Sequence, residues 1–267
     1  MERPVFVITG ASAGIGRAAA VALAPIGQVV LVGRDERRLH DALDAVRAAG
    51  GADAVAHRCD FADLGDVGEL AVKLRELDRV DVLANNAGLL ATSASTTVDG
   101  FETTMQVNHL AGFLLAHLLR DRLSGGRLIT TTSAMHVQGR LDPPVFTTRD
   151  RFSRWRAYAD SKQANVHFTR EAARRWPDIT PACFHPGAVR SRFGDENGLF
   201  RLVKKMPGFF VSPESGADTL VWLATTDDAV TRGGYYVRRR LRRPGGKAGD
   251  DALAKRLWDR GAETLAL

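Results

Sequence analysis

The sequence predicts an α/β protein of the Rossmann type, a doubly wound and mostly parallel seven-stranded sheet with helices on both faces. Two observations carry this prediction. Short runs rich in β-branched residues alternate with longer segments in which Ala, Leu, Glu and Arg recur at helical spacing, which is the pattern of βαβ units. The first run also passes directly into a glycine-rich turn followed by a segment of small residues.

Seven segments are expected to be strands, because each is short, rich in apolar or β-branched residues and bounded by turn residues. They cover residues 5–9, 29–32, 54–58, 80–84, 126–132, 180–184 and 234–237. Helices are expected directly behind the glycine-rich turn and at residues 37–49, 67–77, 110–123 and 161–175. This order of elements indicates a parallel sheet that is buried on both faces.

The chain of 267 residues, 45% hydrophobic and 25% charged, is long enough for one large domain. It has no repeat, linker or break in composition, so we expect residues 1–267 to form a single domain. No apolar run approaches the roughly 18 residues of a membrane-spanning helix, and the N-terminal residues lack the pattern of a signal peptide. Cys59 and Cys183 stand far apart without metal-ligand spacing. We therefore expect a cytoplasmic protein with no metal site and no disulfide framework.

Two segments differ in character from the rest. Much of the net charge of +6 comes from the basic stretch 238–247, where the run Arg238–Arg243 would suit nucleic acid or acidic lipid. A solvated surface segment is the interpretation that we prefer, so no nucleic-acid partner is expected. Residues 193–211 alternate aromatic and aliphatic with basic side chains. They suit either a lid over a hydrophobic substrate or a helix packed on the core.

The glycine-rich turn, Thr9 to Gly16, has the features of a phosphate cradle. Gly10 permits a tight turn out of the strand, Gly14 lets the backbone approach a pyrophosphate, and Gly16 lets the helix pack close to the sheet. The N-terminus of the helix presents free N–H groups and the positive end of its dipole to the phosphates. Strand, turn and helix in this order predict a dinucleotide site.

Arg34 follows the second expected strand, about 20 residues beyond the cradle, where such sites place the group that meets the adenosine ribose. An acidic residue there would hydrogen-bond the 2′-hydroxyl, whereas an arginine would pair with a 2′-phosphate. Because Arg34 comes before Asp35, we expect NADP and regard NAD as the less favoured cofactor. Arg34 as an ordinary exposed residue is the alternative.

Tyr158 and Lys162 stand four residues apart at the start of an expected helix, so both side chains lie on one face. A fixed ammonium beside a phenol stabilises the phenolate, and we expect it to lower the tyrosine pKa from about 10 toward working pH. A general acid or base works best with its pKa near that pH. By itself the spacing also fits an ordinary helix face.

Together these motifs resemble those of the short-chain dehydrogenase/reductase family, and the resemblance covers essentially the whole chain. Residues 9–16 match its T-G-x-x-x-G-x-G loop, 85–88 its N-N-A-G motif and 158–162 its Y-x-x-x-K motif. Pro186-Gly187 matches the proline-glycine pair after the sixth strand, and Asn108 and Ser133 stand at the remaining catalytic positions.

The resemblance implies a catalytic set of Asn108, Ser133, Tyr158 and Lys162. Ser133 would bind the substrate oxygen, Tyr158 would exchange its proton, Lys162 would hold the nicotinamide ribose, and Asn108 would anchor a water in the proton relay. Asn108 as a helix cap and Ser133 as the end of a strand are the structural alternatives. The positions expected to bind the cofactor are Gly10, Ser12, Ala13, Gly14, Ile15, Gly16, Arg34, Asp60, Phe61, Asn86, Ala87, Gly88, Tyr158, Lys162, Pro186, Gly187, Val189 and Ser191.

Several further matches resemble the retinol-dehydrogenase-like branch of that family, whose members act on bulky apolar alcohols and carbonyl compounds. They include Thr132 to His136, Ala164-Asn165, the triplet His185-Pro186-Gly187 and an interval of 24 residues between Ser133 and Tyr158. His136 and His185 could touch substrate, but we expect them to be structural.

The function expected from this resemblance is an NADP(H)-dependent oxidoreductase that transfers a hydride between nicotinamide and a ketone, aldehyde or alcohol. The alternative is a non-catalytic, NADP-sensing regulatory or scaffold protein. We expect a small-molecule carbonyl or alcohol substrate and no membrane span. The sequence leaves open the substrate, the reaction direction and whether the chain forms a homo-oligomer.

Overall fold

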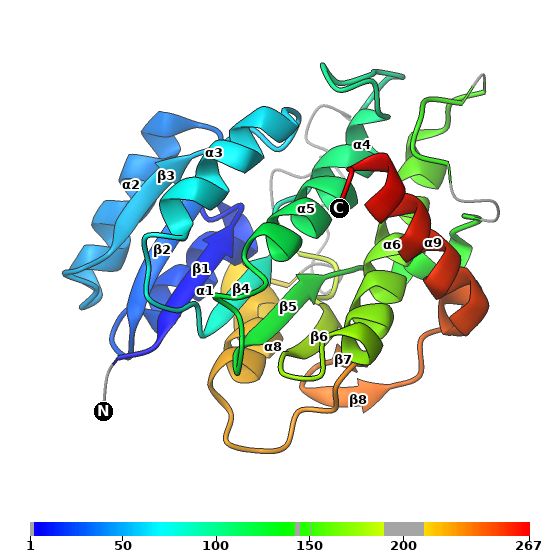
Figure 1. The fold of residues 1–267 in the computed structure, drawn as a ribbon. Coiled ribbons are helices and arrows are strands. Elements are labelled where there is room, and N and C mark those ends of the chain that lie inside the picture. The colour runs from blue at the N-terminus through cyan, green and yellow to red at the C-terminus, as the bar shows by residue number, and fades with distance from the viewer. Residues whose placement is uncertain (1–2, 142–144, 150, 190–210) are drawn as a thin grey trace.

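A computed structural model describes residues 3–141, 145–149, 151–189 and 211–267. One sheet of eight strands runs through the molecule in the order β3-β2-β1-β4-β5-β6-β7-β8 (Figure 1). The strands are β1 (Val5–Thr9), β2 (Gln28–Gly33), β3 (Val55–Arg58), β4 (Val82–Asn85), β5 (Arg127–Thr131), β6 (Thr180–His185), β7 (Gly234–Val237) and β8 (Arg240–Arg242). Neighbouring strands are parallel except for β7 and β8, which are antiparallel.

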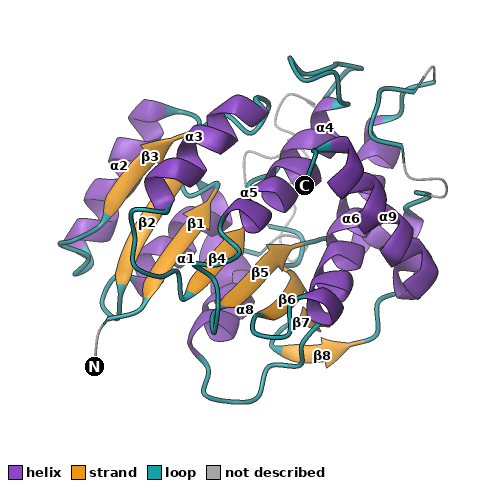
Figure 2. Ribbon diagram, viewed as in Figure 1, coloured by secondary structure: helices purple, strands orange, loops and turns teal. Residues whose placement is uncertain are grey.

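Helices cover both faces of the sheet (Figure 2). Their bounds are α1 (Gly14–Leu23), α2 (Glu36–Ala48), α3 (Leu64–Leu74), α4 (Thr103–Met105), α5 (Ala111–Leu118), α6 (Arg154–Arg175), α8 (Pro213–Thr225) and α9 (Asp251–Thr264). Shorter turns are the π-helical η1 (Gln106–Leu110) and the 3₁₀ turns η2 (Ala134–Gln138) and η3 (Gly246–Gly249). Helices α1, α2 and α8 pack on one face, and α3, α5 and α6 on the other, with α9 against α6.

The core lies in two layers because side chains of a strand point alternately to opposite faces of the sheet. In β1, Phe6 and Ile8 belong to the cluster under α1 and α8, whereas Val7 belongs to the cluster under α3 and α5. All three side chains are buried. A strand that is buried on both faces has no polar face to present, which explains why these strands appear in the sequence as continuous apolar runs.

The predicted Rossmann-type fold is confirmed, and the structure adds an eighth strand at the edge of the sheet. Strand β8 falls inside the basic stretch and forms a hairpin with β7. The turn uses Arg238 and Arg239 in left-handed backbone conformations, with φ of 49° and 61°. All three residues of β8 are exposed, and arginines on a short edge strand discourage pairing with another chain. Arg239 also donates from Nε to Asp218 Oδ2 at 2.8 Å.

The strand order reverses direction between β1 and β4, and this reversal positions the site. In open α/β sheets, ligands bind at the carboxyl ends of the strands beside such a point. The turn after β1 and the loop after β4 therefore lie side by side there. The expected lid at 193–211 falls outside the described residues apart from Val211, which forms an isolated parallel bridge with Val189. Ser191 also lies outside them.

Candidate active site

The turn between β1 and α1 has a backbone that only glycine adopts easily at two positions. Gly10 has φ of 68° and Gly14 has φ of 56°. At Gly16, a Cβ atom would lie 2.4 Å from the carbonyl oxygen of Gly10, so a larger residue would force α1 away from the turn. Ala13 at the N-cap makes no side-chain cap and the first turn of α1 carries no acidic residue. The N-terminus of α1 is thus suited to a phosphate.

Thr9 joins this turn to the loop after β4. Its hydroxyl donates to the carbonyl oxygen of Ala84 at 3.1 Å and accepts from the main-chain N–H groups of Asn86 and Ala87 at 2.9 and 3.0 Å. The Asn86 amide donates back to the Thr9 carbonyl oxygen at 2.9 Å. These bonds hold the predicted cofactor residues 86–88 against the glycine-rich turn.

The end of β2 carries the residues expected near the adenosine ribose. Asp35 caps α2, accepting from the main-chain N–H of Arg38 at 2.9 Å, and this bond lowers the pKa of its carboxyl group. The Arg34 side chain is 64% exposed, and its Nη1 lies 3.7 Å from Asp60 Oδ2. Phe61, the residue after Asp60, is buried. The Asp35 carboxylate is therefore engaged by the start of α2, whereas the exposed Arg34 guanidinium is paired with Asp60.

Three predicted catalytic side chains converge beside the ends of β4 and β5. Ser133 at the N-cap of η2 hydrogen-bonds the phenol of Tyr158, which stands in the first turns of α6. Lys162 Nζ lies 5.6 Å from the centre of the Tyr158 ring and donates to the carbonyl oxygen of Thr131 at 3.2 Å. Lys162 is buried, at 3% exposure, whereas Tyr158 keeps part of its surface open. The phenol of Tyr158 and the hydroxyl of Ser133 thus lie side by side, and the ammonium of Lys162 lies behind them.

We expected Lys162 to lower the pKa of Tyr158, and in the protein without cofactor this expectation is wrong. Burial raises the pKa of Tyr158 to about 12, and the hydrogen bond with Ser133 lowers it only in part. Burial also lowers the pKa of Lys162 to about 8. Loss of hydration disfavours the charged form of each group, and this cost exceeds the attraction that helical spacing alone suggested.

Asn108, the fourth predicted catalytic residue, lies on η1 with its side chain fully engaged. Its Oδ1 accepts from the main-chain N–H of Leu89 at 2.7 Å, and its Nδ2 donates to the Leu89 carbonyl oxygen at 2.9 Å and to Ser161 Oγ at 3.0 Å. A Cβ atom on Gly88 would lie 3.2 Å from Asn108 Oδ1 and 3.4 Å from Lys162 Nζ. Asn108 therefore fixes the loop after β4 close to Lys162, and its role in a water relay stays a prediction.

The two histidines near Ser133 differ in their hydrogen bonds. His136 contacts the Ser133 carbonyl oxygen through Nδ1 at 2.6 Å and the main-chain N–H of Gly245 through Nε2 at 3.2 Å. Backbone groups thus engage both of its nitrogens, as expected of a structural residue. His185 accepts from the Ala134 N–H through Nδ1 at 3.3 Å, and burial lowers its pKa to about 4.

An open cavity of about 1050 Å³ lies at the carboxyl ends of β6 and β7. Its lining includes His185, the predicted cofactor residues Pro186 and Gly187, and the arginines Arg238 and Arg240 of the hairpin. The cavity therefore adjoins the Ser133 side of the candidate site, and it is large enough for a small-molecule ligand.

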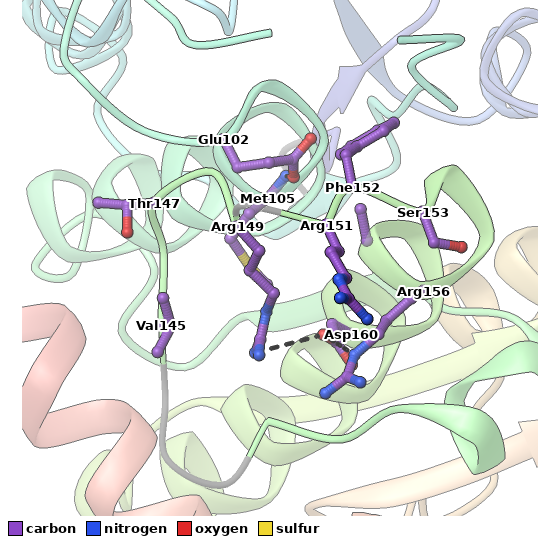
Figure 3. A pocket seen from close by; sticks show the side chains of 11 residues that line it. Glu102, Met105, Val145, Thr147, Arg149, Arg151, Phe152, Ser153, Arg156 and Asp160 are labelled. Carbon is purple, nitrogen blue, oxygen red and sulfur yellow. Dashed lines mark hydrogen bonds and ion pairs between the residues drawn. The ribbon is translucent and has the colours of Figure 1, made fainter. Parts of the chain in front are cut away.

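A second, smaller pocket lies beside the chain that leads from Ser133 to Tyr158 (Figure 3). Asp160 is buried within it and faces Arg149 Nη2 at 3.8 Å and Arg156 Nε at 3.6 Å. Its Oδ1 accepts from the main-chain N–H of Arg140 at 2.6 Å. Burial raises the pKa of the Asp160 carboxyl group, while these bonds and charges act in the opposite direction. Asp160 thus ties the flanking chain to the helix of Tyr158.

Three residues of the site were not among the predicted ones. Thr9 and Asn165 are buried polar side chains, and Thr131 contributes its main-chain carbonyl. The sequence carries a weak signal for Asn165, which stands one helical turn after Lys162. Every residue has a main-chain carbonyl group, so the sequence could not indicate that the one of Thr131 accepts hydrogen bonds from Lys162 and Asn165.

Among the described residues, no helix is long and apolar enough to cross a membrane. That part of the chain also holds no group of three His, Cys, Asp or Glu residues that could bind a metal ion. Cys59 and Cys183 are both buried and free.

Comparison with known proteins adds independent observations. The family model described as short chain dehydrogenase matches residues 4–199. A protein of Streptomyces sp. (strain C5), provisionally named a daunorubicin C-13 ketoreductase, is 50% identical over 263 residues, covering 97% of this chain and 91% of that protein. Human retinol dehydrogenase 13 is 34% identical over 278 residues, covering 98% of this chain and 84% of the relative.

A solved structure of similar fold is the alcohol dehydrogenase of the archaeon Thermococcus sibiricus, complexed with 5-hydroxy-NADP. Its TM-score is 0.65 at 27% identity, and the alignment covers 83% of this chain and 90% of that chain.

The fold, the glycine-rich turn and the Ser133, Tyr158 and Lys162 arrangement define an oxidoreductase that uses a nicotinamide cofactor and acts on CH–OH or C=O groups. The chain belongs to the short-chain dehydrogenase/reductase family. Within that family its relatives place it in the retinol-dehydrogenase-like branch.

Proposed function

We propose that the protein is an NADPH-dependent reductase of a bulky apolar ketone or aldehyde. The observation that carries this proposal is the convergence of Ser133, Tyr158 and Lys162 beside the glycine-rich turn. The names of two relatives, a ketoreductase and a retinol dehydrogenase, support the proposal of a ketone or aldehyde as the substrate. Both names describe chemistry at a carbonyl or alcohol carbon of a large molecule.

Tyr158 acts as the proton donor and Ser133 as the second hydrogen-bonding group for the substrate oxygen. Because the pKa of Tyr158 is about 12, the phenol keeps its proton at neutral pH, which is the state needed to protonate a developing alkoxide. The nicotinamide cofactor, when bound, supplies the hydride.

The residues present fit such a cofactor. Gly10 and Gly14 give the turn its left-handed backbone, and Gly16 lets α1 pack close against that turn, so that the N-terminus of α1 faces the place where a pyrophosphate would be held. Besides Arg34, Tyr158 and Lys162, the other described positions that we assign to it are Ser12, Ala13, Ile15, Asp60, Phe61, Asn86, Ala87, Gly88, Pro186, Gly187 and Val189. Lys162 would hold the ribose of the nicotinamide.

We assign the preference for NADP to Arg34. Asp35 is occupied as the cap of α2, which removes the carboxylate that would otherwise select the ribose hydroxyl of NAD. The exposed Arg34 guanidinium is left to meet a 2′-phosphate.

Paired fluorescence titrations with NADPH and NADH test this assignment. Arg34→Ser should weaken NADPH binding by about 10- to 150-fold, since a hydrogen bond to a charged group contributes roughly 1.5–3 kcal/mol, and should leave NADH binding unchanged. Arg58→Ser is the matched control, because Arg58 is also an exposed arginine at the end of the neighbouring strand. Equal losses for both cofactors would contradict the assignment.

Tyr158→Phe tests the chemistry. The purified protein should consume NADPH with some member of a panel of bulky ketones and aldehydes, and this variant should lose at least about 100-fold in kcat while still binding NADPH. Tyr235→Phe, which removes another buried phenol, serves as the control. Full activity of Tyr158→Phe would show that the proton donor is wrongly assigned.

The non-catalytic, NADP-sensing alternative predicts a different result, tight NADPH binding with no turnover on the whole panel. A pure sensor needs the glycine-rich turn but not Ser133, Tyr158 and Lys162 together, so the site favours the enzyme. We also propose a single domain that works in the reducing cytoplasm, with which two buried free cysteines are compatible.

A further inference from the structure

Asn165 is a buried amide in the middle of α6, one turn beyond Lys162. It is 2% exposed and lies on the side of the helix that faces η1 and β5. A buried carboxamide needs partners for all of its polar atoms, because each unpaired group costs free energy. Its contacts therefore describe what the side chain does.

The Asn165 side chain joins two separate pieces of backbone. Its Nδ2 donates to the carbonyl oxygen of Asn108 at 3.0 Å and to the carbonyl oxygen of Thr131 at 3.2 Å. Both amide hydrogens are then used, which fixes the orientation of the carboxamide. Its Oδ1 lies 3.2 Å from His109 Nδ1, so the imidazole must carry its hydrogen on Nδ1 to donate there.

The Thr131 carbonyl oxygen is also the acceptor for Lys162, whose Nζ lies 3.2 Å away. Asn165 and Lys162 thus share one acceptor at the carboxyl end of β5. The Asn108 carbonyl, which accepts the second Nδ2 hydrogen, belongs to the π-helical turn η1, and the Asn108 side chain holds the loop after β4. One side chain consequently couples the two elements between which Lys162 is placed.

We propose that Asn165 is a positioning residue of the active site, which sets where the Lys162 ammonium sits by holding its acceptor, the Thr131 carbonyl, in register with η1. This inference rests on the proposed function, in which Lys162 lies behind Tyr158. Asn165 itself does not touch the substrate. Its effect passes through the position of Lys162.

A residue that only stabilises the fold would behave differently. Removing a buried amide takes one hydrogen bond away from each of two carbonyl groups and lowers stability in either case. Only a positioning residue lowers kcat in enzyme that remains folded and saturated with cofactor, while the KM for the carbonyl substrate stays the same. Misplacement of a catalytic group by about 1 Å can cost up to 100-fold in rate.

The test compares Asn165→Leu, which keeps the branched arrangement of four side-chain heavy atoms and removes both donors, with Thr169→Val. Thr169 is fully buried one turn further along α6, and its hydroxyl donates to the main-chain carbonyl oxygen of Asn165 at 2.9 Å. Its removal also breaks a buried hydrogen bond on this helix, but at a greater distance from Lys162. Both variants are compared for melting temperature, NADPH binding, kcat and KM at a temperature where each is folded.

At saturating NADPH, we expect Asn165→Leu to lower kcat by at least about tenfold with the KM for the carbonyl substrate within about threefold of the parent protein, and Thr169→Val to leave kcat unchanged. Asn165→Ala, which is smaller, is the substitute if the leucine variant does not fold, with the same fall in kcat expected. Unchanged kcat in the Asn165 variants, or an equal fall in Thr169→Val, overturns the inference. A parent protein without Tyr158-dependent activity would instead refute the proposed function.

Discussion

Lys162→Met should make the protein more stable at neutral pH while removing its activity. Burial lowers the pKa of Lys162 from 10.5 to about 8, so the charged lysine is held at a cost in the folded state. Methionine has a similar length and no charge, and it adapts easily to its surroundings. The substitution therefore removes the cost and keeps most of the packing.

The size of the effect follows from the two pKa values. One pKa unit corresponds to about 1.4 kcal/mol, so the burial of the charged lysine costs roughly 3 kcal/mol below pH 8. Loss of the hydrogen bond to the Thr131 carbonyl oxygen offsets about 1 kcal/mol of the gain. A net stabilisation of about 2 kcal/mol corresponds to a melting temperature higher by about 4–8 °C in a protein of this size.

The same two pKa values also determine the sign of the pH dependence of stability. Between pH 8 and 10.5 the folded lysine is neutral and the unfolded lysine is still charged, so unfolding takes up a proton and the stability of the parent protein rises with pH. The advantage of Lys162→Met is therefore complete below pH 8, shrinks above it, and is gone by about pH 10.5.

Urea denaturation of both proteins at pH 7, 8.5 and 10, without cofactor, measures this difference. A conservative exchange at an exposed lysine, Lys255→Met, serves as the control and should leave stability nearly unchanged. The reasoning is refuted if Lys162→Met is less stable than the parent at pH 7, or if the difference between them does not narrow as the pH rises.

Two further predictions concern the glycine-rich turn and its neighbour. Gly16→Ala should weaken NADPH binding by more than about tenfold, because its Cβ atom would lie 2.4 Å from a carbonyl oxygen of the turn, whereas Gly68→Ala in α3, with nothing within 4 Å, should bind NADPH normally and be slightly more stable. Thr9→Val should cost at least about 2 kcal/mol in urea denaturation, since it leaves two main-chain N–H groups of the loop after β4 without their acceptor. Normal NADPH binding by Gly16→Ala, or normal stability of Thr9→Val, would contradict these interpretations.

The sequence was sufficient to predict the parallel sheet and the main elements of the site. Strands buried on both faces form apolar runs, and the helical spacing of Tyr158 and Lys162 follows from the period of an α-helix. Both features are local in the chain. The glycines of the cradle were found for the same reason, since a turn that needs a positive φ at Gly10 and Gly14 shows it in the residue type.

The features that were missed have physical causes that a sequence pattern does not show. Strand β8 is an Arg-Leu-Arg segment, and its turn uses Arg238 and Arg239 at positive φ, where a sequence pattern would require glycine or asparagine. The pKa of Tyr158 depends on how much protein surrounds the phenol, which spacing does not reveal. Asn165 is meaningful only once β5 and η1 are known to lie on either side of it.

The chain between Ser133 and Tyr158 is attached to side chains of α6. Asp160 and Gln163 on α6 hold its first part through the N–H groups of Arg140 and Leu141, and Asp160 also faces Arg149 near its second part. The anchors stand on the helix that carries the proton donor. Loop sequence can therefore change between these anchors without moving the phenol of Tyr158, because the anchors themselves stand on the helix.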